Sequence, residues 1–301
     1  MITRIPFDQP GFSFLEIESN DSDAGANNVK DLLNSLPASG LAVVGTRYPQ
    51  RRSFELLEKT FRELKDSGLV IVSGFARGID SRAHELALEH GLKTIAILGC
   101  GLNIDYPREN RVLRQKILDQ DGIIISPFDS GTEPIPRNFL HRNRLIAYFS
   151  KAVWVVEAAA VSGTLNTAHH ASELNRDLYA TSSFPNDLFF EGNQKLLSQR
   201  DSSKYPSAYP FFDAFSFGTS WNQLKVIDSK NKKKKPDRRN ISRIQKWILD
   251  LKHEQGECRI QSLMNFATTQ GLSPGQFYLE FQKELDQKKI TEDLLGIVDL
   301  V

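Results

Sequence analysis

Cysteine is scarce in this chain, and the patterns that mark secreted and membrane proteins are missing. The two cysteines, Cys100 and Cys258, lie far apart among 301 residues and form neither a disulfide framework nor a zinc-type spacing. No apolar run approaches the roughly 20 residues that span a bilayer, and the first residues lack a basic-then-apolar signal pattern. We therefore expect a cytoplasmic protein that does not associate with a membrane.

Motifs for familiar catalytic chemistry are also missing. The sequence has no GxxxxGK[ST] phosphate loop, no GxSxG nucleophile elbow and no metal-ligand cluster. The stretch from Gly99 to Gly101 lacks the third glycine of a dinucleotide fingerprint. These absences predict a protein without cofactor or metal that is not an enzyme.

The chain has almost no excess of basic over acidic residues, apart from one basic segment. The formal net charge is +1, and the sequence KNKKKKPDRR at residues 230–239 concentrates basic residues that the rest of the chain balances. A near-neutral chain is not a general binder of nucleic acid, so any anion site must be a local patch. The basic segment is typical of a solvated linker.

Short apolar runs alternate with helical patterns over the first two thirds of the chain. The runs are rich in Val, Ile and Leu on both faces, as in strands of a parallel sheet that helices cover. We expect strands at 41–45, 69–73, 93–99, 122–126, 152–158 and 177–183, and helices at 52–66, 79–90, 108–120, 139–150 and 164–175. This order predicts an α/β fold, a doubly wound, mostly parallel Rossmann-like sheet.

Changes in composition divide the chain into four segments. The expected order is an acidic N-terminal extension with one short helix near 27–36 (1–40), a Rossmann-like domain (41–229), the basic linker (230–239) and a winged-helix domain (240–301). The aromatic block YPFFDAFSF is expected to pack on the Rossmann-like domain. Three helical patterns followed by two short strands favour the winged helix, with Ser273 capping the third helix.

The most informative run is SGFARGID, which closes one predicted strand and opens a helix. It places Arg77 between Gly74 and Gly78, and glycines let backbone N–H groups approach an anion at a helix start. Other strand ends carry similar loops, such as Gly45-Thr46-Arg47. Because ligands of such sheets bind beyond the carboxyl ends of the strands, these loops predict a phosphate-binding rim.

A second group of arginines surrounds an aromatic residue. Arg137, Arg142 and Arg144 flank Phe139 in the sequence PRNFLHRNR. Arginine pairs with phosphate oxygens and aromatic rings stack on bases, a combination typical of single-stranded nucleic-acid binding. A solvated surface charge is the favoured interpretation of any one of these arginines taken alone, whereas Phe139 is equally consistent with a core position of its helix.

Three titratable residues near these loops admit a catalytic or a structural role. Asp80 and His84 lie one helical turn apart, as an acid–base pair would, but we favour a role in bracing the turn and the helix. Glu157 ends a buried strand and either binds a ribose or holds the following turn, and we favour the latter.

These motifs, in this order, resemble the DprA (Smf) family of DNA-processing proteins. The resemblance covers roughly residues 40–200 and rests on five motifs: GTR at Gly45–Arg47, SGFARGIDSRAH at Ser73–His84, YPRENRVL at Tyr106–Leu113, FLHRNRLIAYFS at Phe139–Ser150 and EAAAVSGTLNTAHHA at Glu157–Ala171. The chain departs from the family pattern at Leu140, at Pro127 and over Ala180–Ser183.

The resemblance implies an extended Rossmann-like domain that binds single-stranded DNA without sequence preference. It further implies a homodimer that protects incoming single strands and loads a RecA-type recombinase on them during natural transformation. Arg47 and Arg108 match family positions that contact DNA phosphates, whereas Arg77, Arg142 and Arg144 line or brace the same pocket. The expected supporting residues of the turns are Gly45, Thr46, Ser73, Gly74, Gly78, Asp80, Asn110, Ser162 and Gly163.

Two other functions remain open from the residues alone. The first is a Rossmann-like nucleotide-binding or nucleotide-hydrolysing protein in which Glu157 and Thr164 serve a ribosyl site. The second is a sensor or scaffold that binds single strands without loading a recombinase. The third expected helix of the winged-helix domain, at 273–290, carries no net charge, which favours a protein contact over DNA reading by residues 240–301.

Overall fold

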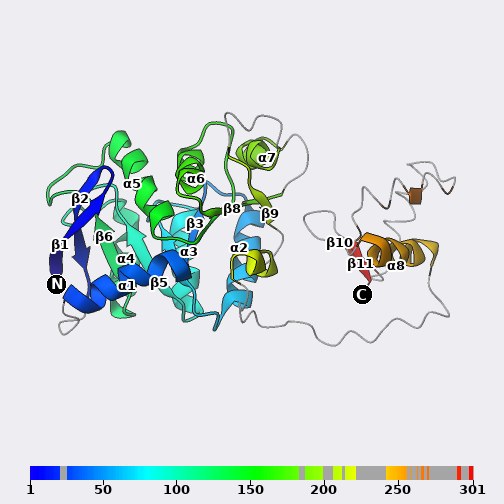
Figure 1. Cartoon of the computed structure of the whole chain (residues 1–301), viewed down its shortest axis with the longest axis horizontal. Helices are drawn as coiled ribbons and strands as arrows, with labels where there is room; N and C mark the ends of the chain where they lie inside the picture. The colour runs from blue at the N-terminus through cyan, green and yellow to red at the C-terminus, as the bar shows by residue number, and fades with distance from the viewer. Residues whose placement is uncertain are drawn as a thin grey trace. The chain divides into compact units, whose positions relative to one another are not determined.

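The structure is a computed structural model that divides into two compact units, Met1–Ile227 and Asp228–Val301. Each unit is described by itself (Figure 1). The described residues are 1–20, 26–182, 187–198, 206–211, 214–221, 242–255, 258, 263, 266–267, 270, 290–292 and 298–300.

The first unit is built on a mostly parallel sheet, as predicted. Its parallel strands are β3 (Gly40–Val44), β4 (Val70–Ser73), β5 (Lys93–Ile97), β6 (Ile123–Ser126), β7 (Ala152–Val155), β8 (Asp177–Thr181) and β9 (Tyr209–Phe211). They lie in the order β6-β5-β4-β3-β7-β8-β9. The chain therefore reverses its direction of winding between β3 and β7, which makes their shared end a topological switch point.

Helices cover both faces of this sheet, which confirms the doubly wound arrangement. They are α1 (Ala26–Ser39), α2 (Arg51–Leu64), α3 (Ile79–Glu89), α4 (Arg111–Asp119), α5 (Pro136–Tyr148), α6 (Gly163–Glu173) and α7 (Glu191–Leu197), with 3-10 turns η1 (Arg108–Asn110), η2 (Leu188–Phe190) and η4 (Ala214–Thr219). Helix α5 begins at Pro136, three residues before the predicted start, because proline suits the first helical position.

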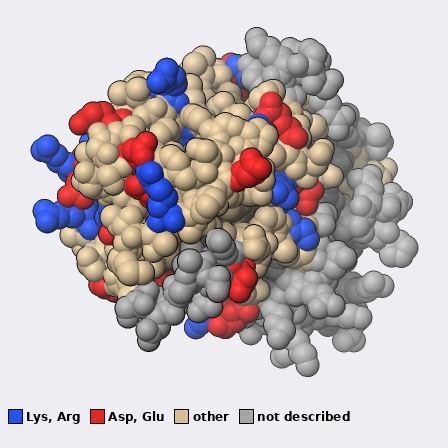
Figure 2. All heavy atoms as spheres, turned by 60° about the vertical axis from the view of Figure 1, so that its left-hand side comes forward, with Lys and Arg blue, Asp and Glu red and all other residues tan. Residues whose placement is uncertain are grey.

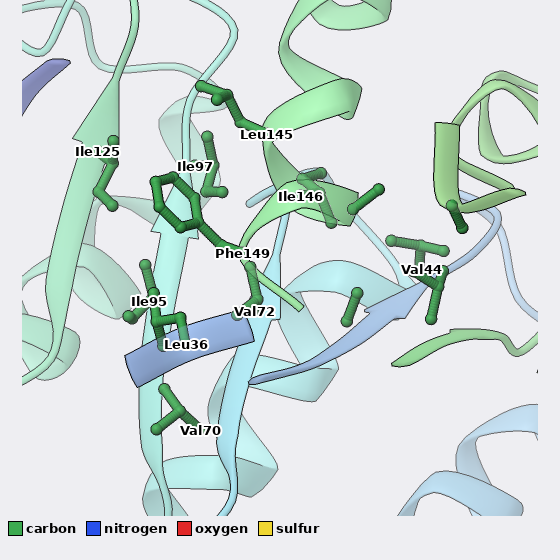
Figure 3. Packing of buried hydrophobic residues seen from close by; sticks show 14 of the residues in the cluster. Leu36, Val44, Val70, Val72, Ile95, Ile97, Ile125, Leu145, Ile146 and Phe149 are labelled. Carbon is green, nitrogen blue, oxygen red and sulfur yellow. The ribbon is translucent and has the colours of Figure 1, made fainter. Parts of the chain in front are cut away.

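Alternate residues of a strand pack into separate hydrophobic cores on the two faces of the sheet. On β5, Ile95 and Ile97 pack on the side of α1 and α5, whereas Ala96 packs on the side of α4. Figure 3 shows Leu36 and Phe149 among the residues of the first side, together with Ile95 and Ile97. Because both faces are buried, the strands read as continuous apolar runs, which is why their positions follow from the sequence.

The N-terminal segment is a correction to the predicted extension with a single helix. The helix is present as α1, but β1 (Ile2–Gln9) and β2 (Phe12–Glu18) precede it as an antiparallel hairpin. Strand β2 pairs antiparallel with β6, so the hairpin extends the sheet to nine strands. Leu15 and Ile17 are buried in the same core as α5. The hairpin is thus part of the first unit.

The aromatic block after α7 packs on the sheet, as expected. Its strand β9 pairs with β8, and Phe211 and Phe217 are fully buried. The ring of Phe211 lies 4.1 Å from that of Trp154, measured between centroids. Burial of three large rings in one cluster accounts for the retention of this segment at the sheet edge.

The second unit is described only in part. Helix α8 (Arg243–Gln255) matches the first predicted helix, and β10 (Ile290–Glu292) pairs antiparallel with β11 (Val298–Leu300), as the predicted hairpin requires. The third predicted helix and the basic linker lie outside the described residues. The winged helix therefore stays a prediction.

Candidate functional site

A cleft of about 560 Å³ opens at the carboxyl ends of β3 and β7. Its wall includes the loop after β3, the start of α6 and the first turns of α5. This is the switch point of the sheet, where neighbouring loops diverge and leave space for a ligand. The loops after β3 and β4, for which the sequence predicts a phosphate-binding rim, both contribute lining residues to this cavity. We refer to it as the main cleft.

Two glycines let the loops of the main cleft meet. Gly78 has φ +79°, and a Cβ there would lie 2.5 Å from the carbonyl oxygen of Thr46. A Cβ on Gly45 would lie 2.6 Å from the Ile79 side chain. Only glycine permits both the left-handed backbone and this close approach. The loops after β3 and β4 are consequently packed backbone to backbone.

Asp80 and Arg142 form the floor of the main cleft, with Gly74 wedged between them. A Cβ on Gly74 would lie 2.6 Å from Asp80 Oδ2 and 2.8 Å from Arg142 Nη2. Arg142 is 3% exposed, and its Nη1 donates to the carbonyl oxygen of Gly74 at 2.6 Å and to that of Ile97. Arg142 therefore links the ends of β4 and β5 to α5 by hydrogen bonds.

The carboxylate of Asp80 ties two loops together. It accepts a hydrogen bond from Gly74 N at 3.1 Å and further bonds from the backbone of Ala76 and Gly45. Burial raises the pKa of Asp80 to about 6, and the positive charge of Arg142 opposes that rise. Burial also lowers the pKa of Arg142 to about 10. These bonds fit the bracing role favoured for Asp80 from the sequence.

His84 lies fully buried behind the floor. Its Nδ1 is 2.7 Å from Thr94 Oγ1, and that hydroxyl donates to the carbonyl oxygen of Ile71. A neutral His84 with its proton on Nδ1 is the tautomer that fits this pair of hydrogen bonds. Burial, with Arg142 nearby, lowers the pKa of His84 to about 3. A neutral, buried imidazole of this kind braces the helix, as favoured from the sequence.

Glu157 holds the loop after β3 to the end of β7. Its Oε2 accepts from Gln50 N at 2.8 Å and from Ser53 Oγ at 2.6 Å. Its backbone carbonyl accepts from Thr46 N at 2.8 Å. Burial raises the pKa of Glu157, although these donors lower it in part. The carboxylate does not line the main cleft, so the structural role is confirmed.

The remaining predicted turn residues also hold backbone in place. Ser73 Oγ donates to the carbonyl oxygen of Val43 at 2.6 Å, and Asn110 Nδ2 donates to that of Phe75 at 2.8 Å. Ser162 Oγ caps α6 by accepting from Thr164 N at 3.2 Å. Thr46 Oγ1 accepts from the backbone N–H of Tyr48 at 3.3 Å. Gly163, in contrast, has no neighbouring atom within 4 Å of the position that a Cβ would occupy.

Aromatic side chains form one wall of the main cleft. Phe139 lies between two cations, with Arg47 Cζ 5.8 Å and Arg142 Cζ 5.9 Å from its ring centroid. The Tyr106 ring lies 5.5 Å from that of Phe139, and Tyr48 is 77% exposed at the mouth. The two tyrosines were not among the site residues predicted from the sequence. Each precedes a proline beside a loop arginine, and that signal would have indicated them.

The predicted arginines other than the buried Arg142 divide into two groups. Arg77 pairs with Glu109 at 2.5 Å, and Arg144 pairs with Glu173 at 2.9 Å on the face between α5 and α6, outside the cleft lining. In contrast, three exposed arginines have no ion-pair partner among the described residues. These, which we call the rim arginines, are Arg47, Arg108 and Arg137.

Of the rim arginines, Arg47 alone lines either cavity, and the other two each follow a lining residue in the sequence. Arg47 lines the main cleft itself, and Arg137 follows the lining residue Pro136. Arg108 follows Pro107, which lines a smaller adjoining cavity. Figure 2 shows basic and acidic side chains interspersed on the face that it brings forward, without a field of one sign. Any attraction for a polyanion therefore depends on a local set of cations.

The fold and this site define a Rossmann-like α/β protein with an arginine-rimmed, aromatic-walled cleft at the switch point of its sheet. Such a cleft suits a ligand that carries both phosphates and rings. The described residues contain no group of three or more potential metal ligands, and no described helix is long and apolar enough to cross a membrane.

The chain belongs to the DNA recombination-mediator protein A family, the DprA/Smf family, whose model matches residues 30–210. Protein Smf from Synechocystis sp. is 39% identical over 182 residues, which are 58% of this chain and 46% of that protein. DNA processing protein DprA from Streptococcus pneumoniae is 38% identical over 170 residues, or 56% of this chain and 60% of that protein. The chain thus matches about half the length of these relatives.

Solved structures of the family have the same fold. DNA processing protein A from S. pneumoniae is similar with a TM-score of 0.61 and 29% identity, covering 72% of this chain and 74% of that one. The Helicobacter pylori protein, whose structure is described in terms of its single-stranded DNA binding mode, gives a TM-score of 0.57 and 30% identity. That match covers 71% of this chain and 87% of the other. Both likenesses support the Rossmann-like assignment.

Proposed function

We propose that the main cleft binds single-stranded DNA without sequence preference. The observation that carries the proposal is the exposed Arg47 beside Phe139 in the main cleft, in a family one of whose members is described as binding single-stranded DNA. Guanidinium groups pair with phosphate oxygens, whereas rings stack on any base. An exposed aromatic wall is useful only for bases that are free of a duplex.

The division between floor and rim supports this assignment. The floor arginine, Arg142, donates hydrogen bonds from Nη1 to protein carbonyls, so it fixes the shape of the cleft. The rim arginines keep their donors for a ligand. Phosphate contacts made by exposed arginines release counterions, so affinity should fall steeply as salt rises.

We further infer that the bound strand is protected and handed to a RecA-type recombinase, and that the protein acts as a homodimer. Family membership supports this inference, because the family is described as recombination mediators. The winged helix and the basic linker at 230–239 would add a protein contact and a nonspecific attraction for DNA. Recombinase filament formation on single strands coated by a single-strand-binding protein tests the handover. No acceleration, with normal strand binding, would favour the scaffold function.

The first experiment compares a labelled oligo-dT strand with a duplex of the same length by fluorescence anisotropy. We expect a clear preference for the single strand, which Arg47→Glu should abolish because it places a negative charge at the mouth. Arg62→Glu is the matched control, since it makes the same change of charge at a residue that is exposed in the last turn of α2 and lines neither cavity. Equal binding of strand and duplex would contradict the proposal.

A nucleotide-hydrolysing function has less support. It would require a carboxylate that faces the ligand, and Glu157 is instead engaged with Gln50 and Ser53. Asp80 does line the main cleft, but its oxygens hold the backbone of neighbouring loops. Accordingly, Glu157→Gln should weaken folding and leave no specific loss of turnover to measure.

A further inference from the structure

A second, smaller cavity adjoins the main cleft, and nothing in the family description assigns it a role. Its volume is about 90 Å³, and we call it the side hollow. It is lined by Gly74, Phe75, Arg77, Leu98, Gly99 and Pro107 together with five residues that it shares with the main cleft. A volume of this size holds several water-sized spheres, roughly the space of one aromatic ring.

The boundary between the two cavities is aromatic. Tyr48, Tyr106 and Phe139 line both cavities, and Arg47 does so too. Tyr106 is braced against Phe139 and is still 36% exposed, while Tyr48 is 77% exposed. Exposed tyrosines at a concave junction present ring faces on which bases can stack.

The side hollow also has its own cation. Arg77 lines it but does not line the main cleft, and it pairs with Glu109 at 2.5 Å. Both side chains are about half exposed, at 50% and 57%, so the ion pair is solvated and breaking it costs little free energy. A phosphate that approached this hollow would compete with Glu109 for Arg77.

We propose that the side hollow is a second base subsite, which receives the nucleotide adjacent to the one in the main cleft. Tyr48 and Tyr106 stack against bases at the junction, and Arg77 leaves Glu109 to pair with the phosphate beside the second base. The inference rests on the proposed function of the main cleft and extends it to a minimal ligand of two nucleotides.

The stacking part is tested with labelled dT oligomers in the full-length chain. Tyr48→Ala should weaken binding by about fivefold or more, the lower end of the range for one stacked base. Tyr48→Phe should keep the affinity, because the ring remains. Tyr209→Ala is the control, since Tyr209 is exposed on strand β9 and lines neither cavity. In Tyr48→Trp, bound dT should quench the indole emission.

The phosphate part predicts a gain of affinity. Glu109→Gln should tighten binding severalfold, because Arg77 can then pair with the phosphate without first leaving Glu109. Glu55→Gln should leave the affinity unchanged, although Glu55 also pairs with an arginine, at 2.8 Å. A role of Arg77 limited to loop structure would give no gain.

The ligand length separates this inference from the proposed function. The dinucleotide pdTpdT should displace labelled oligo-dT at a lower concentration than pdT does. In Tyr48→Ala the two competitors should displace it at the same concentration. If the unaltered protein binds oligo-dT, the variants bind it with the same affinity, and pdTpdT competes no better than pdT, the side hollow is not a subsite and the main cleft acts alone. If the unaltered protein binds no strand at all, the proposed function and this inference both fail.

Discussion

The floor and the rim of the main cleft use the same residue type in opposite ways. Arg142 is buried and donates to protein carbonyls, whereas Arg47 is exposed and has no ion-pair partner among the described residues. Buried charge is costly unless protein groups satisfy it, and exposed charge contributes little to folding. The comparison teaches that the floor determines whether the cleft exists and the rim determines what it binds.

Replacing the floor cation should have the largest effect on folding. Arg142→Met leaves the carbonyls of Gly74 and Ile97 without their donor and Asp80 without a neighbouring positive charge. We expect the free energy of unfolding to fall by about 3–5 kcal/mol, as when one partner of a buried charged group is removed. Urea denaturation followed by circular dichroism measures the change. A loss of strand binding with unchanged stability would instead place Arg142 on the rim side of the comparison.

The loop contact at Gly78 should come next. Gly78→Ala forces a Cβ to within 2.5 Å of the Thr46 carbonyl oxygen at a positive φ, so we expect a loss of about 1–3 kcal/mol from backbone strain alone. Gly163→Ala is the matched control, because nothing lies within 4 Å of its Cβ position. Its thermal midpoint should barely move. Equal destabilisation by both substitutions would show that loop packing does not form the cleft.

The buried titratable groups behind the floor predict a dependence of stability on pH. His84 has a folded pKa of about 3 against an ordinary 6.5, so the unfolded state binds the extra proton and stability falls as the pH drops from 6.5 towards 3. Asp80 has a folded pKa of about 6 against 3.8, so its contribution rises as the pH falls through that window and partly offsets the loss.

The shift of His84 is the larger of the two, so the net result is a loss of stability in acid. Urea midpoints at pH 7.5, 6 and 5 should decrease in that order. His84→Gln should be less stable at pH 7.5 but should lose less between pH 7.5 and 5. A midpoint that rises on acidification in the unaltered protein would show that Asp80 dominates.

The fold was largely predictable because its strands are buried on both faces. The apolar runs that became β3 to β8 are bounded by glycines and loops, so their positions lie within a few residues of the observed strands. The β1–β2 hairpin was missed because its outer residues are polar and its burial depends on pairing with β6, far along the chain. Pro10-Gly11 between alternating residues was the local signal for its turn.

The site was only partly predictable. The loop glycines and arginines were identified from their places at strand ends. Their division into paired and unpaired groups was not, because the partners Glu109 and Glu173 meet them only in the folded chain. The burial of Arg142 likewise depends on carbonyls of two separate strand ends. Long-range partners of this kind leave no periodic trace in a sequence.

The most direct test of the central claim is the salt dependence of oligo-dT binding in the unaltered protein and in Arg47→Ala. Arg47 is exposed, so its removal should change the free energy of unfolding by no more than about 0.5 kcal/mol. The affinity should nevertheless fall for every sequence, and the slope of log affinity against log salt should become shallower by about 0.7, as one phosphate contact is lost. An unchanged slope and affinity in this correctly folded variant would contradict the assignment of the rim to phosphate binding.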